Sequence, residues 1–322
     1  MRSDKPLVSI GMPVYNGERY IRQALDSLLA QDYENFELVI SDNASTDHSA
    51  EICQEYLAMD RRIRYYRNDT NLGSVNNFNR LFELSSGKYF MWAADNDVWH
   101  PTFISTCVSV LEAEPDVVLV YSRTMTIDSE GNPLGLAPDQ IDTRGMPAVH
   151  RYKHLMWNLY WCNMTYGVIR GEVLAQTGKF RKVWGSDFVL LAELALRGTF
   201  AQVPEPLFYR RTNNLDEESE TYKERFLSYL DPVNAVERSK RSYEDLWLEL
   251  CDAHLQIVAC APINFLERLR AAMVTVLCFR LRFGVRWHGV LFAEGMAKRL
   301  VPKNLRRKIL SFIHSSTVNG VQ

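Results

Sequence analysis

Regularly spaced cysteines and long apolar runs are missing from the chain. Its six cysteines form no CxxC pair, which argues against a zinc cluster or a disulfide framework and fits a reducing cytosol. The first residues lack the continuous apolar core of a signal peptide, because Pro6, Gly11 and Pro13 interrupt it. The longest apolar stretches, 155–169 and 271–279, are shorter than the roughly 20 residues that cross a bilayer. We therefore expect a cytoplasmic globular protein without a membrane span.

An excess of charge of one sign is also missing. The 322 residues carry 37 Lys and Arg against 39 Asp and Glu, and this balance argues against a protein that binds nucleic acid. The average hides a split, because residues 262–322 hold eleven Lys and Arg but only Glu267 and Glu294 as acids. The C-terminal segment is therefore basic, and the rest of the chain is acidic.

Two common phosphate-binding motifs are absent after the first expected strand. The chain has neither a GxGxxG fingerprint nor a P-loop there, which disfavours a dehydrogenase and a P-loop enzyme. A nucleotidyltransferase would need a glycine-rich loop followed by Arg and Lys, where this chain has Tyr15-Asn16-Gly17-Glu18. Any bound phosphates must therefore be neutralised in another way.

Apolar runs alternate with amphipathic stretches in the first third of the chain. This alternation is typical of βαβ units around a buried parallel sheet, and it predicts an α/β fold. The expected strands are 7–14, 36–41, 63–66, 89–94 and 117–121. The expected helices are 18–31, a segment that ends near 59, 75–84 and 101–114.

Polar side chains follow four of these strands. Asn16 follows the first, Asp42 the second and Arg67 the third, while Asp95 and Asp97 follow the fourth. Because parallel sheets bind ligands at the carboxyl ends of their strands, we predict a site at this edge. Two carboxylates one residue apart suit Mg²⁺ or Mn²⁺, which would bridge the protein and a diphosphate. The DxD triplet alone is weak evidence, since loops often carry Asp for turns.

The remainder of the chain divides at two changes in composition. Glycine and proline residues between 126 and 146 predict a flap or a linker, followed by the aromatic segment 149–169. A helix over 187–197 and a strand over 200–211 come next, and acidic residues 215–224 mark a boundary. The expected parts are 1–125 and 126–215, as two halves of one domain, and 216–322, as a helical basic extension.

Several motifs occur in an order that points to a known family. The first strand with Pro13-Val14-Tyr15-Asn16, the segment 42–47, the turn Asn71-Leu72-Gly73 and the strand before Asp95 are the matching parts. Together they resemble the PxYN, DxSxD, NxG and DxD motifs of the family 2 glycosyltransferases over about residues 7–212. The resemblance implies a GT-A-type, Rossmann-like nucleotide-binding sheet with a helical C-terminal extension.

The resemblance also implies how a nucleotide-diphosphate sugar, UDP-linked, is bound. Asp42 would accept the imide N–H of uracil, Asp97 would coordinate the metal, and Asp95 would serve the metal and the ribose. Asn96 stands where many relatives carry Asp. The implied donor-binding set is Pro13, Tyr15, Asn16, Asp42, Arg67, Asn71, Asp95 and Arg210.

A second match lies before the helix expected at 187. Trp184-Gly185-Ser186-Asp187 is similar to the ED segment of the family, with Ser186 in place of Glu. The resemblance implies that Asp187 is the catalytic base, kept ionised by the helix dipole. The alternative is that Asp187 only caps its helix. Among the tryptophans, Trp99 is a candidate platform for a sugar ring, whereas Trp92, Trp157 and Trp161 are expected in the core.

Apolar residues and arginines recur at helical spacing near the C-terminus, which predicts a basic amphipathic helix. This helix either packs on the catalytic domain or contacts an anionic membrane or a lipid-diphosphate acceptor. The sequence Arg306-Arg307-Lys308 before apolar residues 309–313 repeats the pattern. The apolar positions are Leu266, Leu269, Met273, Val276, Phe279 and Phe283, and the arginines are Arg268, Arg270, Arg280, Arg282 and Arg286.

These features together predict an inverting, metal-dependent glycosyltransferase of surface-polysaccharide or glycolipid assembly. It would transfer a single sugar to a hydroxyl of a glycan or lipid-linked acceptor, since the QxxRW signature of processive synthases is absent. We expect it in the cytoplasm or peripherally on the cytoplasmic face of the inner membrane. A catalytically inactive GT-A-like module that binds a nucleotide or glycan stays open, because Asn96, Ser186 and the missing histidine after Arg211 depart from the family pattern.

Overall fold

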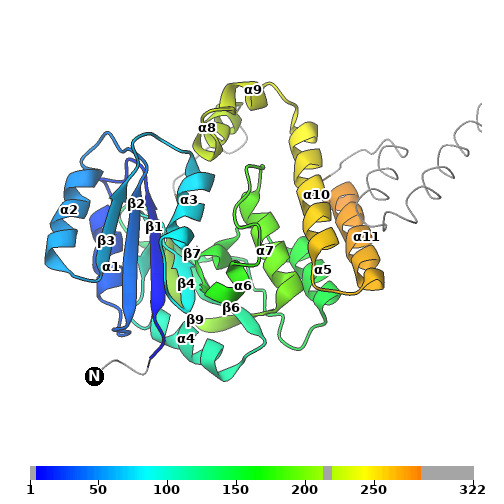
Figure 1. Cartoon of the computed structure of the whole chain (residues 1–322), viewed down its shortest axis with the longest axis horizontal. Coiled ribbons are helices and arrows are strands. Elements are labelled where there is room, and N and C mark those ends of the chain that lie inside the picture. Colours follow the sequence, from blue (N-terminus) through cyan, green and yellow to red (C-terminus); the bar gives the residue numbers. More distant parts are fainter. Residues whose placement is uncertain (1–4, 213–219, 284–322) are drawn as a thin grey trace, which may run out of the picture.

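The fold is built on one nine-stranded mixed sheet with helices on both faces (Figure 1). The computed structural model describes residues 5–212 and 220–283. The strands follow the order β3-β2-β1-β4-β8-β6-β9-β5, and β7 pairs with β6 at the side of this path. The predicted α/β class is therefore confirmed.

The first half of the sheet is parallel, as the sequence predicts. Hydrogen bonding joins β3, β2, β1 and β4 in parallel, and the last residues of the first three strands come level: Val14 pairs with Asp42, and Asp42 with Arg67. The strands are β1 (Val8–Val14), β2 (Phe36–Asp42), β3 (Ile63–Arg67) and β4 (Tyr89–Trp92). The helices between and after them are α1 (Ile21–Leu29), α2 (Ser49–Met59), α3 (Ser74–Glu83) and α4 (Phe103–Ala113).

The second half of the sheet is mixed. The short strand β8 runs antiparallel to both β4 and β6, whereas β6 and β9 pair in parallel. The sequence prediction missed β8 and also β5, which pairs with β9. The strands are β5 (Val98–Trp99), β6 (Val117–Ile127), β7 (Pro133–Leu136), β8 (Val168–Arg170) and β9 (Thr199–Arg211). The helices are α5 (Ala148–Asn158), the 3-10 turn η1 (Asn163–Tyr166), α6 (Gly171–Leu174) and α7 (Ser186–Arg197).

The segment 126–146 is not the loose linker that was one of its two predicted forms. Its first part forms β7, an exposed hairpin strand on β6. Its second part is packed, because Ile141 and Thr143 have no exposed surface and Asp139 is 4% exposed. The Tyr121 hydroxyl accepts a hydrogen bond from the Ile141 N–H and donates one to the Ile141 carbonyl.

Alternating side chains place a separate hydrophobic core on each face of the sheet. In β4, Tyr89 and Met91 point into the core beneath α1, α2 and α4, whereas Phe90 and Trp92 point into the other core. This two-sided burial explains why the strands read as nearly continuous apolar runs. Because both faces of the sheet are buried, polar groups can gather in the loops at the carboxyl ends of the strands.

Four helices follow the sheet and lie beside it (Figure 1). Capping boxes start the two long helices, with Ser242 and Asp245 at one and Asn264 and Glu267 at the other. Among the described helices, none is both long and apolar enough to cross a bilayer. The helices are α8 (Glu220–Leu230), α9 (Ala235–Ser239), α10 (Tyr243–Cys260) and α11 (Phe265–Arg282).

The helix predicted near the C-terminus exists as α11, but its buried face differs from the predicted one. Leu266 and Met273 are 56% and 54% exposed. The buried side chains are Ala271, Ala272, Thr275, Cys278 and Phe279. Small residues allow α11 to approach α5 closely, which a count of large apolar residues does not reveal. The residues Arg286, Arg306, Arg307, Lys308 and 309–313 lie outside the described part of the chain.

A buried pair of hydroxyls fastens α11 to α5 and provides a test of this packing. The Tyr152 hydroxyl lies 2.6 Å from Thr275 Oγ1, which also donates to the Ala271 carbonyl. Tyr152→Phe should lower the free energy of unfolding by about 1 kcal/mol, because one buried hydrogen bond is lost. Thr275→Val should cost more, roughly 1–3 kcal/mol, because the phenol is left without a partner. Urea unfolding measures the free energy of unfolding of both variants. An unchanged stability of Thr275→Val would contradict the packing of α11 on α5 through this hydroxyl pair.

Candidate functional site

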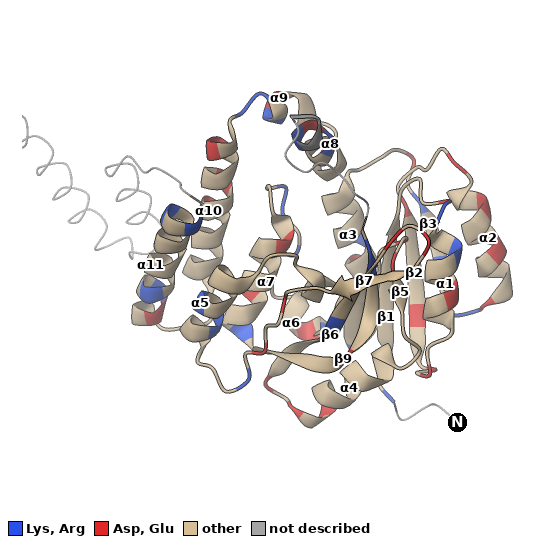
Figure 2. Cartoon of the chain, turned by 180° about the vertical axis from the view of Figure 1, so that it is seen from behind, with Lys and Arg blue, Asp and Glu red and all other residues tan. Residues whose placement is uncertain are grey.

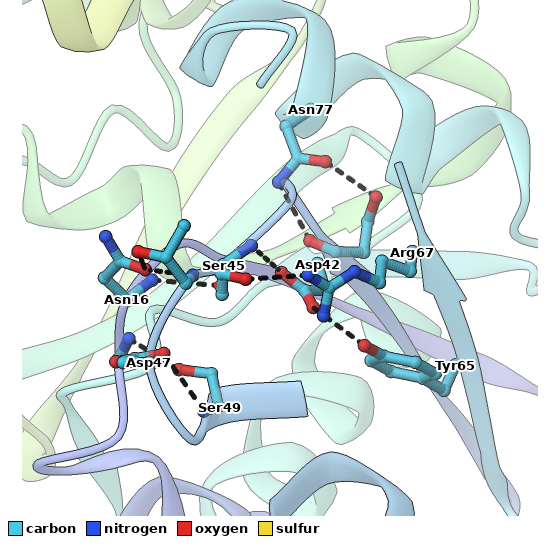
Figure 3. A network of polar contacts seen from close by, with 11 residues as sticks. Asn16, Asp42, Ser45, Asp47, Ser49, Tyr65, Arg67 and Asn77 are labelled. Carbon is cyan, nitrogen blue, oxygen red and sulfur yellow. Dashed lines mark hydrogen bonds and ion pairs between the residues drawn. The ribbon is translucent and has the colours of Figure 1, made fainter. Parts of the chain in front are cut away.

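A network of polar contacts joins the loops after β1, β2 and β3 (Figure 3). Asp42 lies at its centre with no exposed surface. One carboxylate oxygen accepts the Ser45 N–H at 2.8 Å, and the other accepts the Tyr65 hydroxyl at 2.7 Å and the Arg67 guanidinium at 3.3 Å. Asp42 therefore holds the loops in place, and a nucleobase reaches its carboxylate only if Arg67 or Tyr65 gives way.

Asn16 and Asn71, both predicted to bind the donor, also fasten loops. Asn16 has a positive φ of 54°, which an asparagine tolerates in a turn. Its side-chain oxygen accepts the Thr46 N–H at 2.8 Å and so ties the loop after β2 to the end of β1. The side-chain oxygen of Asn71 accepts from the Asn43 side chain and from the Gly73 N–H, both at 2.8 Å. Both asparagines thus give the edge its shape.

Some of the predicted donor-binding side chains face solvent. Tyr15 is 43% exposed, the Arg67 side chain is 47% exposed, and Pro13 is partly exposed. Pro13 lies in β1 and Tyr15 directly after it, and Arg67 belongs to the Asp42 network. Their exposed surface can contact a ligand without rearrangement of the network.

Gly17 is a further residue of this edge, to which the sequence reasoning assigned no role. Its backbone N–H donates to Ser49 Oγ at 2.8 Å, and this hydrogen bond holds the turn after β1 in place. A Cβ atom at position 17 would lie 2.3 Å from an Asp95 carboxylate oxygen. A side chain at position 17 would therefore have to displace the Asp95 carboxylate from its place in the DxD loop.

Asp95 and Asp97 form an acidic pair of raised pKa. Burial and the charge of Asp97 raise the pKa of Asp95 to about 7. Burial raises the pKa of Asp97 to about 6, against the opposing effects of the Arg211 N–H and the charges of Arg210 and Arg211. A bound cation would stabilise the ionised form of both carboxylates, because it offsets their repulsion and their loss of solvation.

The acidic pair fits a divalent cation shared with a diphosphate. Among the described residues, no group of three or more His, Cys, Asp and Glu side chains converges into a complete protein cage. Mg²⁺ and similar ions commonly use one or two carboxylates and take their remaining ligands from substrate phosphates and water. Asp95 and Asp97 supply that number of carboxylates.

Arg211 holds the DxD loop, although the sequence reasoning assigned the functional arginine to Arg210. Arg211 is 4% exposed, and its N–H donates to Asp97 Oδ1 at 2.8 Å. The guanidinium donates to the Asn96 carbonyl and to Gln23 Oε1. It also donates to the carbonyls of Asp128 and Ser129 in the turn between β6 and β7. One side chain thus connects β9, the DxD loop, α1 and the β6–β7 turn.

Asp187 lies in the first turn of α7 and lines a cavity of about 270 Å³. The N-cap is Gly185 with a positive φ, so Asp187 is not the capping residue, although its carboxylate accepts the Phe188 N–H at 3.0 Å. Burial raises the pKa of Asp187, against hydrogen bonds from the Cys162 thiol and the Phe188 N–H and the charge of Arg210. The carboxylate is therefore more basic than that of an exposed aspartate.

Arg210 lines the same cavity as Asp187. Its guanidinium donates to the Trp161 carbonyl at 2.8 Å and to Asn163 Oδ1 at 2.7 Å, which fixes it beside η1. The buried Thr165 hydroxyl also lines the cavity and has no protein partner among the described residues. The cavity thus combines a base, a cation and a free hydroxyl.

The burial of two tryptophans is the reverse of the prediction. Trp99 is 2% exposed and stacks on Phe208 with ring centroids 5.4 Å apart, so the prediction of a sugar platform is wrong for this residue. Trp161, which was expected in the core, is 42% exposed and lines the cavity. Trp92 is fully buried, as predicted.

Two tyrosines are influenced by the charges of both the acidic pair and Asp187. The Tyr229 side chain is 52% exposed, but crowding around its hydroxyl and the charges of Asp95 and Asp187 raise its pKa, and the hydroxyl is hydrogen-bonded to Ser74. Burial and the charges of Asp97 and Asp187 raise the pKa of Tyr166. Each phenol therefore lies within electrostatic reach of the DxD loop and of Asp187. The fold brings together two acidic sites that are about ninety residues apart in the sequence.

Comparison with known proteins finds one family that matches the N-terminal part of the chain. Residues 9–159 match the family described as Glycosyl transferase family 2. The chain contains a family 2 glycosyltransferase domain. An uncharacterized glycosyltransferase of Haemophilus influenzae is 29% identical over 217 residues, which are 65% of this chain and 67% of that protein. One of Rickettsia felis is 36% identical over 138 residues, 42% of this chain and 23% of that protein. The chain thus spans only a part of some longer relatives.

Solved structures show that the fold is of the GT-A type. The structure of Staphylococcus aureus TarS 1-349 in complex with UDP-GlcNAc has a TM-score of 0.65 at 14% identity, and the match covers 97% of this chain and 88% of that chain. The mannosyltransferase PcManGT of Pyrobaculum calidifontis, in complex with GDP-Man and Mn²⁺, has a TM-score of 0.51 at 16% identity. The match covers 99% of this chain and 88% of that chain. The predicted GT-A fold with a helical extension is confirmed.

Arg211→Ala should release the DxD loop, because the three carbonyls and Gln23 that the guanidinium contacts lose their donor. The backbone N–H to Asp97 remains in this variant. We expect a loss of roughly 3 kcal/mol in the free energy of unfolding and weaker binding of UDP in the presence of Mn²⁺. Thermal unfolding and calorimetric titration measure the two effects. Arg61→Ala, at an exposed arginine, is the control, and equal behaviour of the two variants would contradict the role of Arg211.

Proposed function

We propose that the chain transfers a single sugar from a nucleotide-diphosphate sugar to a hydroxyl acceptor with inversion. The observation that carries the proposal is the cavity lined by Asp187, Tyr166 and Tyr229, whose two tyrosines have pKa values raised both by the charge of Asp187 and by that of Asp97 or Asp95. A transferase needs a donor diphosphate site and a base for the acceptor within reach of each other. The family 2 domain supplies the reaction class.

The donor would lie along the carboxyl edge of β1 to β4. Tyr15, Pro13 and Arg67 would contact the nucleoside over the rigid Asp42 network, and Asp95 and Asp97 would hold Mn²⁺ or Mg²⁺ at the diphosphate. Such an ion, when bound, offsets the negative charge that develops on the leaving nucleotide. Similar folds were solved with UDP-GlcNAc and with GDP-Man and Mn²⁺, and we favour a UDP-linked donor.

The acceptor hydroxyl would enter the cavity beside α7. Asp187 would accept the hydroxyl proton as the oxygen attacks the anomeric carbon from the side opposite the leaving diphosphate, which inverts the configuration. Arg210 lies near enough to oppose the rise in the pKa of Asp187, so it keeps the base ionised before the attack. The free Thr165 hydroxyl and exposed Trp161 suit a polyhydroxylated ring.

A glycan or a lipid-linked glycan of surface-polysaccharide or glycolipid assembly is the acceptor class that we favour. The competing possibility is an inactive module that binds nucleotide without turnover, for which Asn96 and Ser186 were the sequence argument. Ser186 takes a structural part here, since its hydroxyl accepts the Arg181 N–H at 2.8 Å. Ser186 therefore stabilises the loop before α7, and its presence in place of Glu does not by itself indicate that a catalytic group has been lost.

Asp187→Asn should leave donor binding unchanged and reduce transfer roughly 10²- to 10⁴-fold, because the amide cannot accept the proton. Donor binding is measured by calorimetry, and transfer or slow donor hydrolysis by nucleotide release. In the wild-type chain, protonation of Asp187 removes the base. Because its pKa is raised, the rate should fall on acidification at a higher pH than an exposed aspartate would give.

The control is Asp32→Asn, at an exposed residue before β2 and thus at the opposite end of the strands. It should retain both binding and turnover. Near-wild-type turnover by Asp187→Asn would exclude Asp187 as the base. Binding of nucleotide sugars by the wild-type chain without turnover of any would favour the inactive module.

A further inference from the structure

The outer face of α11 carries a stripe of exposed apolar side chains, which we call the α11 stripe. Its members are Leu266, Met273, Leu277 and Leu281, which are 56%, 54%, 52% and 68% exposed. Spacings of seven, four and four residues place them on one side of the helix, over a length of about 22 Å. Exposed apolar residues are usually scattered singly over a protein surface, so a continuous row indicates a contact surface.

The α11 stripe lies opposite the face by which α11 packs on the protein. Ala271, Thr275 and Phe279 are buried against α5 and α10, half a helical turn away from Met273 and Leu277. The helix lies at the end of the molecule farthest from α2, in both views (Figures 1 and 2). The stripe is thus directed away from the body of the protein.

The charges on α11 are almost all positive. Arg270 and Arg280 are exposed and, at helical spacing, lie within or beside the stripe. Neither forms an ion pair within the described part of the chain. The single acid of the helix, Glu267, is engaged in the capping box with Asn264. Figure 2 shows the basic residues at both ends of α11.

We infer that the α11 stripe docks onto an anionic lipid bilayer. A helix with an apolar face and basic rim lies in the interfacial plane, with its apolar side chains among the acyl chains and its basic groups at the headgroups. Arg270 and Arg280 have aliphatic stems long enough to reach the headgroups from the sides of a buried stripe.

A second copy of the chain suits this face less well. A twofold contact is self-complementary, and the antiparallel arrangement that pairs Met273 with Leu277 of the partner subunit also places Arg270 beside Arg280 of the partner subunit. No acidic group on the described part of α11 offsets that repulsion, since Glu267 is held in its cap. Anionic headgroups offer the opposite charge at the same positions.

The docking face is connected to the cavity beside Asp187. The Arg282 guanidinium donates to the Met156 and Leu159 carbonyls at the end of α5, and it lies 4.5 Å from the ring centroid of Tyr160. The next residue, Trp161, lines the cavity. If the proposed function holds, a lipid-linked acceptor would be presented to Asp187 by the membrane on which α11 rests. The docking itself does not depend on that function.

Co-sedimentation of the full chain with vesicles tests the inference. We expect binding to an equal mixture of phosphatidylcholine and phosphatidylglycerol, and much weaker binding to phosphatidylcholine alone. Leu277→Glu and Met273→Glu should each weaken binding to the anionic vesicles by roughly tenfold or more, because an apolar group is withdrawn and a like charge is added. Arg270→Gln and Arg280→Gln should each weaken it by about fivefold.

Met59→Glu is the matched control, because Met59 is 77% exposed on α2 and the substitution adds the same charge. It should bind vesicles as the wild-type chain does. All positions are exposed, and thermal unfolding should confirm that the variants are folded. Absence of binding to anionic vesicles, or wild-type binding by Leu277→Glu, would overturn the inference. A wild-type dimer that Leu277→Glu converts to a monomer, without vesicle binding, would assign the stripe to a second copy. Donor binding without vesicles tests the proposed function separately.

Discussion

The arrangement of the site depends on the burial of acidic side chains at the carboxyl edge of the sheet. Asp42 is neutralised within the protein by Ser45, Tyr65 and Arg67, so its burial yields a rigid platform. Asp95 and Asp97 are desolvated without an equal set of partners, and their pKa values rise to about 7 and 6. The same edge therefore contains one carboxylate that serves structure and two for which we propose a cation as partner.

The loops around these carboxylates are held by groups from distant parts of the chain. Gly17 allows the turn after β1 to contact Asp95, and Arg211 at the end of β9 fixes the loop of Asp97. Rigid positioning of this kind reduces the cost of organising a site around a charged ligand. On the far side, Arg210 is held beside η1 by Asn163, and it lines the cavity of Asp187 together with Tyr166 and Tyr229.

Features set by local sequence were predictable, whereas features set by distant contacts were not. The parallel strands and their helices follow from hydrophobic periodicity, and the strand-end positions of Asp42 and Asp95 follow from them. The short strands β5 and β8 depend on pairing with remote strands, and they were missed. Trp99 and Trp161 exchanged roles because burial of an aromatic ring depends on its tertiary neighbours. Arg211 was overlooked because its partners come from residues 23, 96, 128 and 129.

We propose that Asp95 and Asp97 bind a nucleotide diphosphate through a divalent cation. Calorimetric titration of the full chain with UDP, with and without Mn²⁺, tests it most directly, and Asp97→Asn is the comparison. Mn²⁺ should strengthen UDP binding by roughly tenfold or more in the wild-type chain, and Asp97→Asn should abolish this gain. Equal affinity with and without Mn²⁺, or an undiminished gain in Asp97→Asn, would contradict it.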